Sequence, residues 1–250
     1  FGEHAVVYGH PAVAVAIDAG VEVKLEFSEQ WEIRNSYYAN KYVEFKAEKN
    51  PHIQHIISEI FEYNGSPLRI NIQSNLFSAA GLGSSAALSN AMGAALHHLT
   101  KPNEEINLIK LAKIGHSAEA SAQAGRASPT DSATSSLGGC IVVSGEKIES
   151  LNYVYDTKLL TPEGERSWSI HSVELHKNIN DAWLVLGFTG EAAPTGDMVS
   201  GVANRLKENP ALHDEMKAIE NITKAGLTAL KLGNLEAVGM AMNSCHEKLK

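Results

Sequence analysis

The sequence predicts a protein of mixed helices and strands that ends in a mainly helical part. Short runs of alternating apolar and polar residues give the strand pattern, and runs with helical spacing lie between them. From about residue 176 the helical pattern dominates, so we expect two domains, at 1–175 and 176–250. With 44% hydrophobic residues in a chain of 250, a sizeable core can form.

Strand patterns come first along the chain. Apolar runs at 6–8 and 12–17, separated by Gly9-His10-Pro11, predict a hairpin of two buried strands. Pro51 opens a predicted helix that Asn64-Gly65 ends. Further strands are predicted over 21–27, 31–46 and 68–72.

Helical patterns become frequent after residue 84. One predicted helix begins at Ser84, and another begins near Glu104. A buried strand is expected from Trp183 to Phe188, and Asn234 has the side chain of an N-cap for the last helix. The other expected elements are a short helix after Ser128, a strand at 140–143, strands and loops over 145–181, and helices over 199–206 and 212–230.

A turn of small residues at 78–87 joins a predicted strand to a predicted helix. Because its residues are small, the turn exposes backbone N–H groups at the positive end of a helix dipole. Such a helix start favours the binding of an anion such as phosphate. No lysine follows Gly83, so the turn is not a Walker A loop. It also fits the dinucleotide pattern G-x-G-x-x-A, although Glu104 and Glu105 begin a helix where that pattern needs an acid at a strand end. A simple packing turn explains it equally well.

Glu119 falls on the inward stripe of the helix that begins near Glu104. The apolar face runs through Leu108, Ala112 and Gly115, and one further step of four residues reaches Glu119. An unpaired carboxylate on that stripe is costly, so it needs either a partner in the core or a metal ion. Next to a phosphate site, Mg²⁺ is the metal that a carboxylate and a hydroxyl would bind.

Asp131 belongs to Ser128-Pro129-Thr130-Asp131, which begins a short helix that Gly138-Gly139 closes. Ser128 as N-cap, with the aspartate three residues later, would make a capping arrangement that needs no chemistry. The functional alternative is a general base or an electrostatic anchor beside a substrate hydroxyl.

Composition excludes several classes of partner. The formal net charge is −8, from 29 acidic residues against 21 Lys and Arg, and no basic stripe is present, which disfavours nucleic acid and membrane surfaces. No apolar run reaches membrane length, and no signal peptide is recognisable. The two cysteines, Cys140 and Cys245, form no spaced framework, so a reducing cytoplasm is expected.

Three motifs in order resemble those of the GHMP kinases. They are Gly2-Glu3-His4-Ala5-Val6-Val7-Tyr8-Gly9, then Gly81-Leu82-Gly83-Ser84-Ser85-Ala86-Ala87, then Ser128-Pro129-Thr130-Asp131. The first is similar to the mevalonate kinase family, and its archaeal branch in particular. The resemblance implies a two-domain α+β fold, with an S5-like N-terminal ATP-binding domain and a helix-rich C-terminal α+β domain. It also implies ATP-dependent phosphorylation of the 5-hydroxyl of mevalonate in isoprenoid synthesis, with the possibility of a homodimer.

The resemblance also implies roles for individual residues. Ser85 and Glu119 would hold Mg²⁺, and Asp131 would lie beside the acceptor hydroxyl. ATP phosphates would bind the loop formed by Gly81, Leu82, Gly83, Ser84, Ser85 and Ala86. Glu3, His4 and Thr195 would line the mevalonate pocket.

The chain begins at Phe1 without a methionine and stops at Lys250 within a helical pattern, so we expect a piece of a longer protein. The family's upstream lysine and its glycine-rich third motif would then lie outside it. Three other hypotheses stay open from the sequence: another GHMP kinase, such as one for phosphomevalonate; a nicotinamide-dependent oxidoreductase; and a non-catalytic nucleotide-binding relative.

Overall fold

The structure of the chain is a computed structural model. It describes residues 1–36, 41–76, 80–162, 164–179, 182–188, 190 and 195–249. Two four-stranded sheets form its framework, with the strand orders β1-β6-β8-β7 and β2-β5-β3-β4. The strands are β1 (Ala12–Val15), β2 (Val21–Phe27), β3 (Glu32–Asn35), β4 (Val43–Glu44), β5 (Leu68–Ser74), β6 (Cys140–Ser144), β7 (Asn152–Thr161) and β8 (Gly164–Val173).

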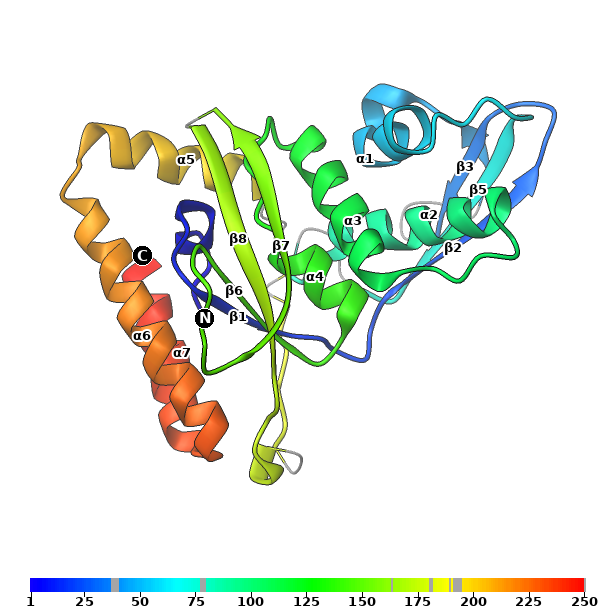
Figure 1. The fold of residues 1–250 in the computed structure, drawn as a ribbon. Coiled ribbons are helices and arrows are strands. Elements are labelled where there is room, and N and C mark those ends of the chain that lie inside the picture. The colour runs from blue at the N-terminus through cyan, green and yellow to red at the C-terminus, as the bar shows by residue number, and fades with distance from the viewer. Residues whose placement is uncertain are drawn as a thin grey trace.

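Both sheets are mainly antiparallel. The exception among the described pairings is β3 with β5, which is parallel and aligns Ile33 with Ile70. Leu68, Ile70 and Ile72 of β5 are buried and alternate with less buried residues, as the sequence pattern predicted. The chain passes from one sheet to the other directly after β1 (Figure 1).

Three helices lie between the two sheets and connect them. These are α2 (Ser84–Thr100), α3 (Leu108–Ala122) and α4 (Thr130–Leu137), which pack on one another (Figure 1). Met92 and Leu96 of α2 are fully buried in the core cluster that also holds Leu68, Ile70 and Ile72 of β5, and Ala133 of α4 belongs to the cluster that holds Ile141 and Val143 of β6. Gly115 of α3 lets α2 approach closely, because a Cβ there would overlap the Asn90 side chain.

The remaining helices cover the outer ends of the molecule. The predicted helix at Pro51 is α1 (Pro51–His55), continued by a wider turn at Ile56–Ile60, and short 3-10 turns lie at Ala47–Lys49 and Lys177–Ile179. The last part of the chain forms α5 (Thr195–Glu208), α6 (Leu212–Leu232) and α7 (Leu235–Leu249), at the left of Figure 1. Asn234 caps α7 as predicted, since its Oδ1 accepts from the N–H of Ala237 at 3.1 Å.

Residues 6–8 differ from the sequence prediction. The expected strand is a 3-10 helix, η1 (Ala5–Tyr8), whose hydrogen bonds are local. The N–H of Val6 donates to Gly2 O at 3.1 Å, and that of Gly9 donates to Val6 O at 3.1 Å. An apolar run this short carries no period that separates a strand from a tight helix. The second half of the predicted hairpin is confirmed as β1.

The predicted buried strand from Trp183 to Phe188 is wrong in this structure. Trp183 is 93% exposed and Val185 is 89% exposed. Strand-forming residues become a strand only when a second strand completes the hydrogen-bond ladder. Among the described strands, none pairs with this segment.

Candidate active site

The predicted phosphate loop, residues 80–86, opens α2 after β5. Gly83 is the residue before the helix and has φ +66°, a left-handed conformation that favours glycine. No side chain caps this helix start, so its first backbone N–H groups have no side-chain acceptor and can receive an anion. Gly81 is exposed and Leu82, Ser84 and Ser85 are half-buried, whereas Ala86 is buried beneath them. The predicted loop also included residues 78 and 79, which lie outside the described residues.

Asp131 lies in the first turn of α4, directly against the phosphate loop. A Cβ built on Gly83 would lie 3.2 Å from the Cβ and the Cγ of Asp131. The Asp131 side chain is accessible to solvent, yet protein atoms surround it. Their desolvation of the carboxylate, with the negative charges of Glu119 and Glu3, raises the pKa of Asp131 to about 6. This carboxyl can therefore bind and release a proton near neutral pH.

The capping interpretation of Asp131 is wrong. Helix α4 begins at Thr130 with Pro129 before it, and no side-chain hydrogen bond caps it. Ser128, the expected N-cap, donates its hydroxyl to Thr130 Oγ1 at 3.1 Å. The aspartate is thus left for another role.

Exchanging Gly83 for alanine tests the contact between the loop and Asp131. The left-handed backbone should cost about 1 kcal/mol of stability. The new methyl group must also displace Asp131, so we expect kcat to fall by about 10²-fold. Gly139→Ala is the matched control, because Gly139 also has φ +66° but no neighbour within 4 Å of its Cβ. Equal losses of kcat in the two variants would contradict the prediction.

Glu119 of α3 is buried, as the inward stripe predicted. Ser85 Oγ donates to Glu119 Oε2 at 3.1 Å, and Gln123 Nε2 donates to the same oxygen at 3.0 Å. The other oxygen, Oε1, is buried without a hydrogen-bond partner among the described residues. His52 Nε2 lies 3.1 Å from this oxygen, as an ion-pair contact that does not meet the geometry of a hydrogen bond. The structure therefore brings together Ser85 and Glu119, which the sequence assigned to one site.

Two neighbours of Glu119 were missed from the sequence. Gln123 follows it by four residues on the helix, a spacing that could have revealed the contact. His52 comes from α1 and is far away in sequence, so no local pattern points to it. A cavity of about 230 Å³ opens beside these groups and is lined in part by Lys49, His52, Ser84 and Ser85.

Glu3 and His4 form the turn before η1. Glu3 is exposed, and its charge acts on Asp131, which places the turn on the same side of the molecule. His4 has φ +58°, which is rare for a residue other than glycine. Burial lowers the pKa of His4, although the charge of Glu3 opposes this effect. Thr195 is the first residue of α5, and its side chain lies outside the described part of the chain.

The order of the elements after α2 excludes the dinucleotide-binding interpretation of the Gly81-x-Gly83 pattern. That motif needs a helix leading to a second parallel strand, with an acid at the end of that strand. Here α2 is followed by α3, and β5 belongs to a mixed sheet. Glu104 and Glu105 are exposed in the loop between these helices.

Comparison with known proteins identifies the family of the chain. The profile of the family described as "GHMP kinases N terminal domain" matches residues 51–139, which include the phosphate loop, Glu119 and Asp131. The mevalonate kinase of Saccharolobus solfataricus is 31% identical over 98% of this chain and 73% of its own length. That of Pyrococcus furiosus is 28% identical over 98% of this chain and 73% of its own length.

A solved structure shows the same fold. The L. major mevalonate kinase in complex with R-mevalonate superimposes with a TM-score of 0.70 and 19% identity, covering 99% of this chain and 71% of that one. The family match and the fold together define a GHMP-type kinase, a class of two-domain enzymes with an α+β fold. Within this class, the chain belongs to the mevalonate kinase family. Matches to the curated relatives span as little as 60% of the relative's length.

Proposed function

We propose that the chain forms the ATP site and part of the acceptor site of a mevalonate kinase, which transfers the γ-phosphoryl group of ATP to the 5-hydroxyl of mevalonate. The observation that carries this proposal is the meeting of three helix ends. The start of α2 offers backbone N–H groups, α3 offers Glu119, and α4 offers Asp131 against Gly83. Phosphoryl transfer needs these parts: positioned phosphates, neutralised charge and a group beside the hydroxyl.

Ser85 and Glu119 fit a Mg²⁺ ion. Both supply oxygen, the donor that Mg²⁺ prefers, and Glu119 Oε1 is a buried acceptor without a hydrogen-bond partner among the described residues, with His52 Nε2 at 3.1 Å as an ion-pair contact. Those residues include no cluster of three or more His, Cys, Asp or Glu side chains suited to a metal. A cation that takes its other ligands from ATP and water therefore suits this site. When bound, Mg²⁺ would neutralise charge on the phosphates.

In the proposed reaction, the 5-hydroxyl oxygen forms a bond to the γ-phosphorus. The bond from that phosphorus to the bridging oxygen breaks, and ADP leaves. The hydroxyl proton passes to the carboxylate of Asp131, whose pKa of about 6 leaves it ionised yet basic enough to accept a proton. Glu3, His4 and Thr195 would hold the acceptor, and the loop N–H groups would hold the phosphates.

The pH profile should carry the signature of Asp131. Its pKa is raised, so the active carboxylate is lost on acidification near pH 6, well above the range of an ordinary aspartate. We expect kcat/KM to fall below a midpoint of about 6, and we expect Glu3→Gln to lower that midpoint, because a negative charge is removed. Rates measured across pH for the wild type and Glu3→Gln check this. A midpoint that the substitution does not move would contradict it.

The function is tested by supplying the full chain with MgATP and either mevalonate or phosphomevalonate. ADP release, with the phosphorylated product followed by phosphorus NMR, is expected with mevalonate. Turnover with phosphomevalonate alone would move the protein to another branch of the GHMP kinases. The acidic surroundings of Asp131, from Glu3 and Glu119, disfavour an acceptor that already carries a phosphate.

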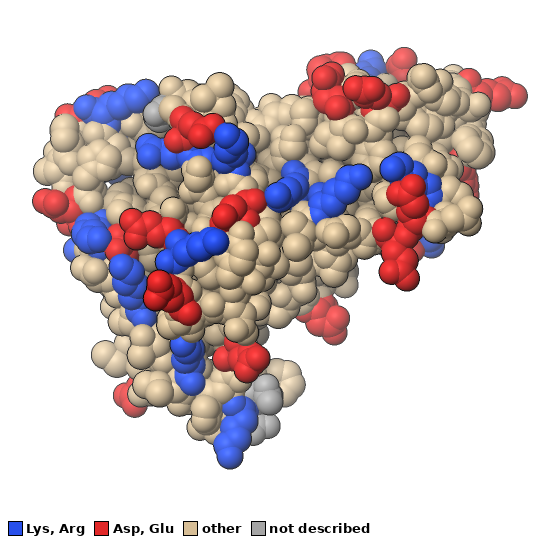
Figure 2. Space-filling model, viewed as in Figure 1, with Lys and Arg blue, Asp and Glu red and all other residues tan. Residues whose placement is uncertain are grey.

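The remaining expectations concern partners and location. No helix in the described part of the chain is long and apolar enough to cross a bilayer. Acidic and basic side chains are interspersed over the face in Figure 2 and form no basic stripe there. Cys140 and Cys245 are both buried free thiols. The free thiols support the proposal of a reducing, cytoplasmic location, whereas small-molecule partners and a homodimer stay predictions.

A further inference from the structure

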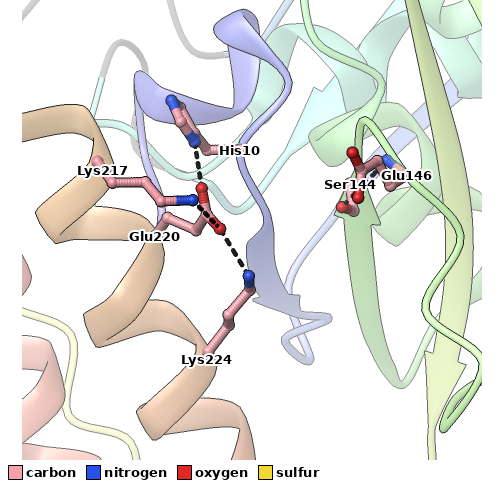
Figure 3. A network of polar contacts seen from close by, with 6 residues as sticks. All are labelled: His10, Ser144, Glu146, Lys217, Glu220 and Lys224. Atoms are coloured by element: carbon pink, nitrogen blue, oxygen red, sulfur yellow. Dashed lines mark hydrogen bonds and ion pairs between the residues drawn. The ribbon is translucent and has the colours of Figure 1, made fainter. Parts of the chain in front are cut away.

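A polar network outside the proposed catalytic groups joins α6 to the loop after η1. Glu220 of α6 is buried, and His10 Nδ1 donates to its Oε2 at 2.7 Å. Lys217 and Lys224 donate to Oε1 at 2.8 and 2.6 Å (Figure 3). Burial alone would raise the pKa of Glu220, but these hydrogen bonds outweigh it and lower the pKa to about 2. We call these four residues the α6 latch.

Two of the four latch residues act within α6, and one connects α6 to another part of the chain. Lys217 and Lys224 share α6 with Glu220, so they orient and neutralise its carboxylate without reaching another element. His10 lies between η1 and β1, and its bond to Glu220 spans two elements far apart in sequence. A charge-assisted hydrogen bond of this length is among the stronger side-chain contacts.

The loop that the latch holds is joined through η1 to the turn that carries Glu3 and His4. The N–H of His10 donates to Ala5 O at 3.2 Å, which ties the latch to the start of η1. On the other side, in the turn that holds Ser144 and Glu146 (Figure 3), the N–H of Gly145 donates to Gly9 O at 2.8 Å. The segment is therefore held between α6 and the end of β6.

This turn is strained and depends on such support. His4 has φ +58°, and Gly2 has φ +88° with no room for a Cβ beside Pro11 O. Trp168 Nε1 also donates to Val6 O at 2.8 Å, from beneath η1. A strained backbone persists only where its surroundings over-determine it, so loss of one support should let the turn relax.

We propose that Glu220 and His10 are positioning residues, through which α6 fixes the orientation of Glu3 and His4 toward the acceptor. The proposal rests on the proposed function for the identity of that acceptor. The hydrogen bond between His10 and Glu220 does not depend on which acceptor is bound. Neither residue touches the reacting atoms.

His10→Ala and His10→Asn separate positioning from general stability. Asparagine carries its amide nitrogen where imidazole carries Nδ1, so it can still donate to Glu220. We expect His10→Ala to raise the KM for mevalonate about tenfold with the KM for ATP unchanged, and His10→Asn to restore it. Unchanged KM values in His10→Ala, an equal rise for both substrates, or no rescue by His10→Asn would overturn the proposal.

Glu220→Gln should weaken the same contact, because it removes the negative charge that strengthens the hydrogen bond from His10, and Glu215→Gln is its matched control. Glu215 also lies on α6 and pairs with Lys248 of α7 at 2.8 Å, away from η1. Hydrogen exchange in the full chain gives a readout independent of the acceptor: amides at 2–10 should exchange faster in Glu220→Gln than in Glu215→Gln. If amides at 2–10 exchange faster in Glu220→Gln but the enzyme phosphorylates an acceptor other than mevalonate, the proposed function is overturned and the latch is supported. Unchanged exchange would overturn the latch, whatever the acceptor.

Discussion

Replacing Asp131 with asparagine is expected to lower kcat by about 10³-fold while the protein stays folded. Asparagine has the shape of aspartate but can neither accept the hydroxyl proton nor stabilise positive charge. The carboxyl packs against Gly83 and is close to the charges of Glu3 and Glu119. Its ionised form therefore lowers the free energy of unfolding. Removing the charge should therefore raise the melting temperature slightly or leave it unchanged. Steady-state kinetics and thermal unfolding of the variant measure both effects.

The matched control for this prediction is Asp214→Asn. Asp214 also lies in the first turn of a helix, α6, but it is exposed there. A charge in a first turn contributes about 0.3–1 kcal/mol through the helix dipole, so the control should lose a little stability and no activity. If Asp131→Asn kept its turnover and lost stability as Asp214→Asn does, the aspartate would be a helix-dipole residue only.

Periodicity was sufficient to predict the elements that hold the site. Alternation gave β5, and helical spacing gave α2 and α3, although α3 begins at Leu108 and not near Glu104 as predicted. The two patterns together placed the phosphate loop between a strand and a helix. The stripe that ended on Glu119 predicted both its burial and its need for a partner. Each prediction depended on residues within one element, where side-chain spacing follows from backbone geometry.

Contacts between different elements could not be predicted from those patterns. His52 meets Glu119 because α1 packs beside α3, and no spacing in the sequence encodes that meeting. The same holds for Gly83 against Asp131, which the ordered motifs suggested only through family resemblance. Local patterns also led to wrong predictions where one sequence pattern fits two different local structures. The apolar run at 6–8, predicted as a strand, lies in the 3-10 helix η1, and the polar residues before α4, predicted as a cap, do not cap it.

Exchanging Glu119 for glutamine should weaken cation binding by about 10²-fold or more, because the charge that would hold Mg²⁺ is lost. Ser85 can still donate to the amide oxygen, so the packing between α2 and α3 is retained. We expect kcat to fall in parallel, while binding of ATP without a divalent ion is unchanged. Titration with Mn²⁺ followed by electron paramagnetic resonance, at fixed ATP, measures the affinity without requiring turnover.

This experiment also decides between the two explanations that the sequence left open for a carboxylate on an inward stripe. A core ion pair predicts lost stability and unchanged cation affinity, since removing one partner leaves the other buried and unpaired. A metal ligand predicts the reverse, because the repulsion between Glu119 and Asp131 also disappears. Glu104→Gln is the control, as Glu104 is exposed and pairs only loosely with Lys101 at 3.3 Å. Normal Mn²⁺ affinity in Glu119→Gln would assign the buried carboxylate to the core, with His52 as its partner.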